Sequence, residues 1–199
     1  TLKYSQLALT DRDKSKFVLH YMCEAYHLQK NQKEYLKTLT LGYKLFPTYP
    51  YFFPRLADFY KAQGNNDKVL ELAEQGLAHY PNNTLFLMAK SIALLNMNKY
   101  SECIEVSRQI ILLNDEQAEP YFNIATCYLN EALSLEQLNQ PRKYRQQLTK
   151  LYTDAKPMME KYRELMPDDI QSGGTEMARI YLHLNKGKQF EEIDRLMRK

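Results

Sequence analysis

The sequence predicts an all-α protein built from stacked helix-turn-helix repeats, and three observations support this fold class. The chain has 199 residues with only 6 Gly, and helix-forming residues such as Leu, Lys, Glu and Gln far outnumber Val. Side chains of one size class recur at a fixed step of 34 residues. The helical pattern is broken at Gly or Asn inside the copies and at Pro between them, and these residues end helices.

Composition and charge exclude several classes of protein. Hydrophobic residues make up 44% and charged residues 26%, which are ordinary values for a folded chain with a continuous core. The 27 basic and 24 acidic residues are interspersed without a basic block, so we expect no nucleic-acid partner. No run of 18 apolar residues is present, so we expect no membrane span in this chain. The cysteines Cys23, Cys103 and Cys127 lie far apart and are expected to pack as small buried side chains.

The 34-residue period defines the first helix of each copy. One column is small in every copy: Cys23, Ala57, Ser91 and Ala125. Two columns are bulky and mostly apolar: Leu19, Phe53, Leu87 and Tyr121, then Tyr26, Tyr60, Leu94 and Tyr128. A small residue lets antiparallel helices approach closely, and the bulky residues fill the space beside it. Gly64 and Asn98 stand where this helix must stop, because Gly and Asn adopt the left-handed conformation at low cost.

The second helix of each copy carries its own apolar stripe. Val69, Ala73 and Leu77 are spaced i, i+4 and i+8, and Pro47 and Pro81 end their copies. A unit of this kind cannot bury its apolar face alone, so it stacks on its neighbours. We expect one solenoid with repeats at about 16–49, 50–83, 84–117 and 118–169.

This pattern resembles the tetratricopeptide repeat (TPR) family. The residues that carry the resemblance are Leu56, Ala57, Tyr60, Gly64 and Pro81, together with F-N-I-A-T-C-Y-L in the fourth copy. The Trp that begins many such repeats is absent, and the likeness covers roughly residues 16 to 167. It implies a right-handed α-solenoid that acts as a non-catalytic scaffold and binds a peptide or protein partner in a concave groove.

The fourth copy exceeds the period by an insertion of 18 residues. The inserted stretch is rich in helix formers and is broken once, at Asn-Gln-Pro, which predicts a protruding helical arm at 129–155. A lengthened last repeat, followed by a Gly-x-x-Phe-Glu-Glu sequence such as that from Gly187, resembles TPR proteins of the Bacteroidetes envelope. This likeness implies a bacterial protein in the periplasm or cell envelope rather than the cytoplasm.

The two ends of the array are expected to differ from the repeats. Residues 172–174, Ser-Gly-Gly, are predicted to form a loop within a terminal capping hairpin at 170–199. Residues 1–15 are interpreted as the remnant of a preceding helix, and the start at Thr1 leaves an upstream signal or domain open. The uncovered end or the arm is then a candidate surface for a homodimer.

One group of residues has the spacing of metal ligands. His20, Glu24 and His27 fall at i, i+4 and i+7 on one helix face. This spacing matches no zinc motif of known mechanism, so a solvated groove face is preferred to a metal-binding or hydrolytic module. No phosphate-binding loop, nucleophile elbow or Cys-x-x-Cys pair is present. We therefore expect no enzyme, metal or cofactor; the regulatory part of a longer enzyme is the other alternative.

The resemblance also implies which residues bind the partner. The groove positions of the family and their neighbours correspond here to Phe17, His20, Glu24, His27, Tyr51, Arg55, Asp58, Lys61, Met88, Phe122, Asn123, Thr126 and Asn130. The Lys and Asn residues that clamp a carboxylate in chaperone-binding members are missing from these positions. We expect an extended or helical peptide with hydrophobic anchors, bound in the groove or on the arm. Met88 is also a candidate for packing between repeats.

Overall fold

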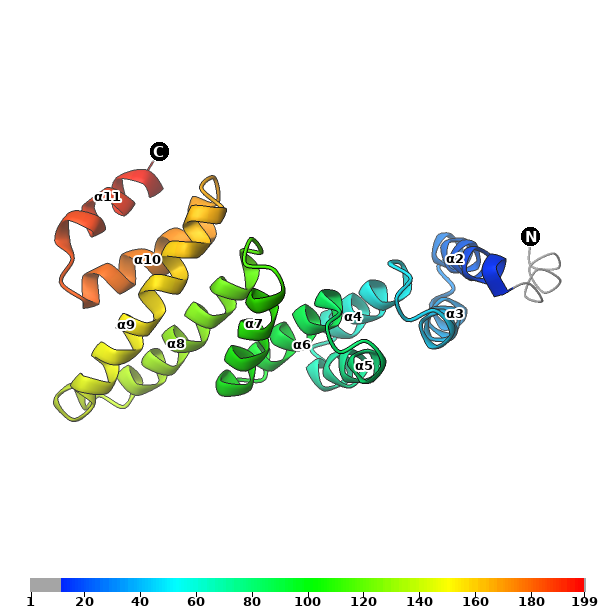
Figure 1. Cartoon of the computed structure of the whole chain (residues 1–199), viewed down its shortest axis with the longest axis horizontal. Coiled ribbons are helices and arrows are strands. Elements are labelled where there is room, and N and C mark those ends of the chain that lie inside the picture. The colour runs from blue at the N-terminus through cyan, green and yellow to red at the C-terminus, as the bar shows by residue number, and fades with distance from the viewer. Residues whose placement is uncertain (1–11, 199) are drawn as a thin grey trace. The chain divides into compact units, whose positions relative to one another are not determined.

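The computed structural model describes residues 12–198, and this part of the chain consists of ten α-helices without any strand (Figure 1). The chain divides into two compact units, Thr1–Pro81 and Asn82–Lys199, which are described separately below. The predicted remnant at 1–15 lies mostly outside the described residues, and its last four residues already belong to the first described helix. Within residues 12–198, no helix combines the length and the apolar character that a membrane span requires.

The first unit contains two helix-turn-helix pairs. Its helices are α2 (Arg12–Leu28), α3 (Gln32–Leu45), α4 (Phe52–Ala62) and α5 (Asn66–His79). Helix α3 packs against both α2 and α4, and α4 packs against α5. Asn31 and Asn65, which are one period apart, begin α3 and α5, and their side chains accept hydrogen bonds from the backbone N–H groups of Glu34 and Lys68. The same polar cap therefore starts the second helix of both pairs.

The turns inside the repeats follow the 34-residue period. Lys30, Gly64 and Asn98 have positive φ values of 55°, 69° and 59°, which confirms the left-handed conformation predicted for Gly64 and Asn98. After each of them, a backbone N–H group donates to a carbonyl oxygen five residues earlier at 2.9 Å: Asn31 to Tyr26, Asn65 to Tyr60 and Lys99 to Leu94. This bond satisfies a carbonyl that the end of the helix leaves free. The bulky column that contains Tyr26, Tyr60 and Leu94 thus marks the end of the first helix in three copies.

The core of the first unit is aromatic and closely packed. Phe52, Phe53, Leu39 and Leu56 are almost completely buried. Gly42 in α3 allows the closest approach, because a Cβ atom at this position would lie 2.3 Å from Cε1 of Phe52. The ring of Phe52 therefore packs directly on the backbone of α3, and this fixes the start of α4 against that helix.

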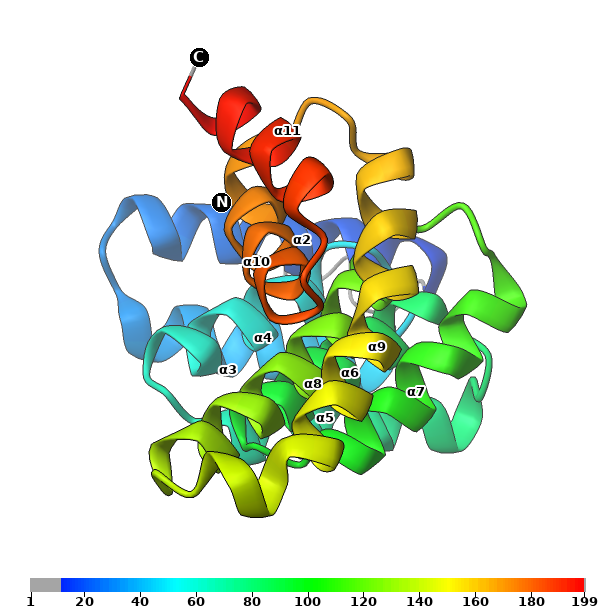
Figure 2. The ribbon, with the colours of Figure 1, turned by 90° about the vertical axis from the view of Figure 1, so that its left-hand side faces the viewer.

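The second unit contains the longest helices of the chain. It is formed by α6 (Thr84–Asn96), α7 (Tyr100–Leu113), α8 (Glu119–Gln137), α9 (Pro141–Leu165), α10 (Ile170–His183) and α11 (Gly187–Met197). Helices α8 and α9 have 19 and 25 residues and lie side by side as a hairpin (Figures 1 and 2). The arm predicted at 129–155 falls on the later part of α8, the turn at Asn139 and the earlier part of α9.

The start of α10 differs from the sequence prediction. Residues 172–174 are helical, so the loop predicted there is wrong. A Cβ atom on Gly173 would lie 3.1 Å from the ring of Tyr162, and one on Gly174 would lie 3.0 Å from Met197. The two glycines bring α10 close to α9 and α11, and this packing outweighs their low helix propensity.

The cysteines and several polar residues are inside the fold. Cys23, Cys103 and Cys127 are free and fully buried, as the sequence predicts. Next to Cys103, the hydroxyl groups of Ser91 and Ser107 lie 2.7 Å apart and are also fully buried. Small polar residues at these positions keep α6 and α7 close while satisfying each other's hydrogen bonds.

Candidate functional site

Several of the predicted groove residues in the first unit meet around Tyr51, at the end of the loop between α3 and α4. Helix α2 contributes His20 and Glu24, one turn apart, and α4 contributes Arg55, one turn after Tyr51. The Tyr51 hydroxyl donates a hydrogen bond of 2.7 Å to Oε1 of Glu24. The His20 ring lies 3.6 Å from the Tyr51 ring between centroids, and the Arg55 guanidinium lies 3.7 Å from the same ring centroid.

Tyr49 and Phe17 extend this arrangement. Nδ1 of His20 and the Tyr49 hydroxyl are 3.1 Å apart and share a hydrogen bond. The Phe17 ring meets Tyr49 edge to face at 5.9 Å between centroids, and Phe17 is 47% exposed. We call Phe17, His20, Glu24, Tyr49, Tyr51 and Arg55 the Tyr51 cluster. Tyr49 was missed by the sequence reasoning because it lies in a loop outside the helical register; the aromatic stretch T-Y-P-Y was the available signal.

The surroundings of His20 and Tyr51 favour the neutral forms of these two rings. Burial lowers the pKa of His20, and this effect exceeds the opposing influence of Glu24. Burial and the hydrogen bond to Glu24 raise the pKa of Tyr51, so its hydroxyl keeps its proton and donates. Burial also raises the pKa of the neighbouring Cys23 thiol to about 12. At neutral pH the charges of the cluster are therefore those of Glu24 and Arg55.

These two charges remain open to solvent. Nη2 of Arg55 lies 3.6 Å from Oε1 of Glu24, which is longer than a hydrogen bond, and the two side chains are 43% and 42% exposed. A guanidinium carries five N–H donors in a plane, so Arg55 has donors available for a ligand. The cluster thus presents a donor, an acceptor and an exposed ring on one prearranged surface.

The three residues predicted as alternative metal ligands do not converge on one point, because His20 and Glu24 lie 3.9 Å apart but His27 lies elsewhere. His27 lies against Tyr35, 5.3 Å between ring centroids, and lines a separate pocket of about 320 Å³ with Tyr26 and Phe59. His20 contacts the tyrosines, and Glu24 contacts Tyr51 and Arg55. Among residues 12–198, no group of three His, Cys, Asp or Glu side chains is placed to hold a metal ion. The geometry does not favour the metal-binding alternative.

The other predicted groove residues are not members of the Tyr51 cluster. Asp58 and Lys61 are exposed on α4, one and two turns after Arg55. Four residues of the second unit are half-buried: Met88, Phe122, Thr126 and Asn130. Of these, Phe122 packs against the ring of Tyr162 at 4.9 Å. Asn123 is buried, and its Nδ2 donates to Oγ of Ser91 at 3.0 Å, which makes it part of the interior.

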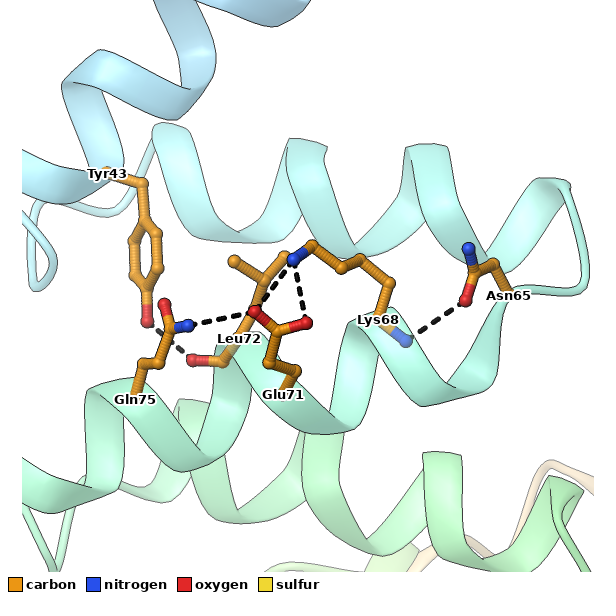
Figure 3. A network of polar contacts seen from close by, with 6 residues as sticks. All are labelled: Tyr43, Asn65, Lys68, Glu71, Leu72 and Gln75. Carbon is orange, nitrogen blue, oxygen red and sulfur yellow. Dashed lines mark hydrogen bonds and ion pairs between the residues drawn. The ribbon is translucent and has the colours of Figure 1, made fainter.

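In the same unit, a polar network joins α3 to α5. Figure 3 shows Tyr43 reaching from α3 to the backbone of α5, where its hydroxyl donates to the Leu72 carbonyl at 2.6 Å. Lys68 and Gln75 both donate to the carboxylate of Glu71, at 2.7 and 3.0 Å. A pocket of about 500 Å³ lies beside this network and is lined by residues of α3, α4 and α5. Burial raises the pKa of Tyr43 to about 12, so its hydroxyl remains a donor that holds the two helices together.

A second cluster, which the sequence reasoning missed entirely, joins three helices of the second unit. The hydroxyl of the fully buried Tyr152 donates to Oε1 of Glu136 at 2.7 Å. Arg179 donates to the Tyr152 hydroxyl at 2.9 Å and to Oε2 of Glu136 at 2.6 Å. The His183 ring stacks on Tyr152 at 3.9 Å between centroids. We call Glu136, Tyr152, Arg179 and His183 the Tyr152 cluster.

Comparison with known structures supports the fold. No protein-family model matches the sequence, and no curated protein matches it. A structure of MamA from Desulfovibrio magneticus RS-1 is similar, with a TM-score of 0.68 and 14% identity over 92% of this chain and 95% of that one. PilF from Pseudomonas aeruginosa has a TM-score of 0.67 and 16% identity over 92% of this chain and 74% of that one.

A third similar structure is a tetratricopeptide repeat protein from Parabacteroides merdae. It has a TM-score of 0.50 and 14% identity over 90% of this chain and 77% of that one. Identities this low show the fold alone. The comparisons therefore confirm the predicted fold class, an all-α solenoid of TPR-like helix-turn-helix repeats.

Proposed function

We propose that this protein is a non-catalytic scaffold that binds a peptide segment of a protein partner over the Tyr51 cluster. The observation that carries the proposal is the convergence of five predicted groove residues in one place. These residues are Phe17, His20, Glu24, Tyr51 and Arg55, and their mutual contacts hold them in position before any ligand arrives. A preorganised surface loses less side-chain entropy on binding, which favours affinity.

The chemistry of the Tyr51 cluster suits a peptide. Arg55 offers N–H donors to a peptide carbonyl or carboxylate, and Glu24 offers an acceptor to a backbone N–H or a basic side chain. Phe17 and Tyr21 are 47% and 68% exposed and provide an apolar face for a hydrophobic anchor. Aromatic and Arg side chains at the centre of such a surface typically contribute most of the binding energy.

The same residues give little support to catalysis. Cys23 lies beside the cluster, but its thiol is fully buried and its raised pKa, about 12, keeps it protonated and weakly nucleophilic. His20 hydrogen bonds to Tyr49 rather than to a Ser or Cys side chain that it would activate. A binding role accounts for the exposed charges without requiring a reacting group.

Selection from a random peptide library on the full chain, followed by fluorescence anisotropy with the selected peptides, tests this proposal. Replacing Arg55 by Ala removes the exposed cation, and we expect binding to weaken about tenfold, or about 1.4 kcal/mol. Arg108 is an exposed arginine on α7, and Arg108→Ala is the matched control that should leave the affinity unchanged. Peptides that bind both variants as well as the parent protein would contradict the proposed site.

A further inference from the structure

We propose that the end of the α8–α9 hairpin docks on an acidic segment of a protein partner. The end of the hairpin, residues 133–150, is called the arm tip. It lies in the second unit, so the proposal does not depend on the peptide site at Tyr51. Unbalanced charge, helix-end electrostatics and exposed leucines at the arm tip support this inference.

The arm tip carries a positive charge that the fold leaves unbalanced. Arg142, Lys143, Arg145 and Lys150 are all exposed, and within the described residues none of them forms an ion pair. Glu136 is the single acidic residue between positions 132 and 153. Its two carboxylate oxygens are already bound by Tyr152 and Arg179, at 2.7 and 2.6 Å. The Tyr152 cluster therefore binds the one acidic residue of the arm tip.

The position of the cations in α9 is unfavourable for the helix itself. The helix begins at Pro141, so Arg142, Lys143 and Arg145 lie in its first turns, where the helix dipole is positive. The first turn contains no acidic residue, and the Gln140 side chain does not cap the helix. Basic residues at this end destabilise a helix, so local stability does not explain them. A local rule broken without an internal compensating contact is typical of a functional surface.

Two leucines at the same end of the hairpin face solvent. Leu133 in α8 is 39% exposed, and Leu138 in the turn is 52% exposed. Between the helices, Leu129, Ala132 and Leu148 are buried, so the hairpin that carries these leucines is itself well packed. In both views the turn between α8 and α9 lies beyond the ends of α10 and α11 (Figures 1 and 2). The arm tip thus mixes exposed cations, of which Lys143 also lies over the Tyr144 ring, with uncovered apolar side chains.

This combination is complementary to an acidic peptide segment that also carries apolar residues. The cations attract Asp and Glu side chains and speed association, and the leucines supply contacts that simple counterions cannot make. A nucleic-acid backbone would match the charges but would offer no aliphatic partner for Leu133 and Leu138. The structure therefore favours a protein partner with an acidic, leucine-containing segment.

Fluorescence anisotropy on the full chain tests the proposal with a labelled peptide of repeated Glu-Glu-Leu. We expect salt-sensitive binding that weakens about tenfold or more in the triple variant Arg142→Glu/Lys143→Glu/Arg145→Glu. The matched control Arg108→Glu/Lys188→Glu/Arg195→Glu has the same net charge, changes exposed residues elsewhere in this unit, and should stay within about twofold of the parent affinity. A peptide of repeated Glu-Glu-Ser should bind about fivefold more weakly. If circular dichroism shows helix loss in the triple variant, the milder R142Q/K143Q/R145Q replaces it, and several-fold weakening is still expected.

Four results would overturn the proposal. The first is equal weakening in the control variant, which would assign binding to net charge. The second is equal affinity for the Glu-Glu-Ser peptide, which would remove the leucines from the interface. The third is absence of peptide binding. The fourth is sedimentation of the parent protein, but not of the triple variant, with phosphatidylcholine–phosphatidylserine vesicles when no peptide binds. This result would make the partner an anionic lipid surface.

Discussion

The Tyr51 and Tyr152 clusters share four residue types, Tyr, Glu, His and Arg, in nearly the same contacts, and the Tyr51 cluster adds Phe17 and Tyr49. In each, the tyrosine hydroxyl donates to a glutamate at 2.7 Å, and a histidine ring lies against the tyrosine ring, at 3.6 Å in one and 3.9 Å in the other. The arginines differ. Arg179 donates to both partners at 2.6 and 2.9 Å, whereas Arg55 contacts the ring of Tyr51 and stays 3.6 Å from Glu24.

This difference distinguishes a structural joint from the surface that we propose binds a peptide. In the Tyr152 cluster, hydrogen bonds among Glu136, Tyr152 and Arg179 hold α8, α9 and α10 together. The Tyr51 cluster also joins two helices, but its arginine keeps donors that face solvent. We propose that the position of the arginine decides whether such a set of residues serves stability or recognition.

The largest expected effect is on the stability of the second unit. Tyr152→Ala removes a fully buried ring and leaves Glu136 and Arg179 without their shared hydroxyl. We expect the free energy of unfolding to fall by about 3–5 kcal/mol, measured by urea denaturation of the full chain. Tyr152→Phe keeps the ring and should lose about 1–2 kcal/mol. A loss below about 1 kcal/mol for Tyr152→Ala would mean that this cluster is not a structural joint.

A pair of arginine variants tests the comparison directly. Arg179→Ala removes two charge-assisted hydrogen bonds from a half-buried cluster, and we expect it to lower the unfolding free energy by about 1.5–2 kcal/mol. Arg55→Ala breaks a longer and more exposed contact, so its effect on stability should be below about 0.5 kcal/mol. Equal losses in parallel urea titrations would remove the distinction between the two clusters. Conversely, of these two variants only Arg55→Ala should weaken the binding of the peptides selected on the full chain.

Features set by local and periodic patterns could be predicted from the sequence. The left-handed turns at Gly64 and Asn98 depend on the residue and its place at a helix end, so the 34-residue register was sufficient to find them. His20 and Glu24 share a helix face because of their i, i+4 spacing, and the same spacing relates Arg55 to Tyr51, the residue just before α4. The register does not predict which side chains on different helices contact each other.

The features that were missed depend on tertiary packing. Glu136 and Arg179 are separated by 43 residues and by an insertion that breaks the period, so no spacing rule links them. The conformation of the loop that holds Tyr49 follows from the packing of α3 and α4 rather than from a helical pattern. Gly173 and Gly174 look like a loop in the sequence, but contacts with Tyr162 and Met197 make small helical residues favourable there.

The smallest expected effect concerns pH and uses the histidine of the closed cluster. Burial lowers the pKa of His183 below its ordinary value of 6.5, and Arg179 acts in the same direction against Glu136. Because the unfolded chain binds this proton more readily than the folded chain, the contribution of His183 to stability is present above pH 6.5 and is lost as the pH falls through the folded pKa. His183→Phe keeps a ring on Tyr152 without a titrating group. Urea titrations above and below that pH should show a smaller acid-induced loss of stability in this variant than in the parent, whereas equal losses would show that His183 stays neutral or is equally protonated in both states.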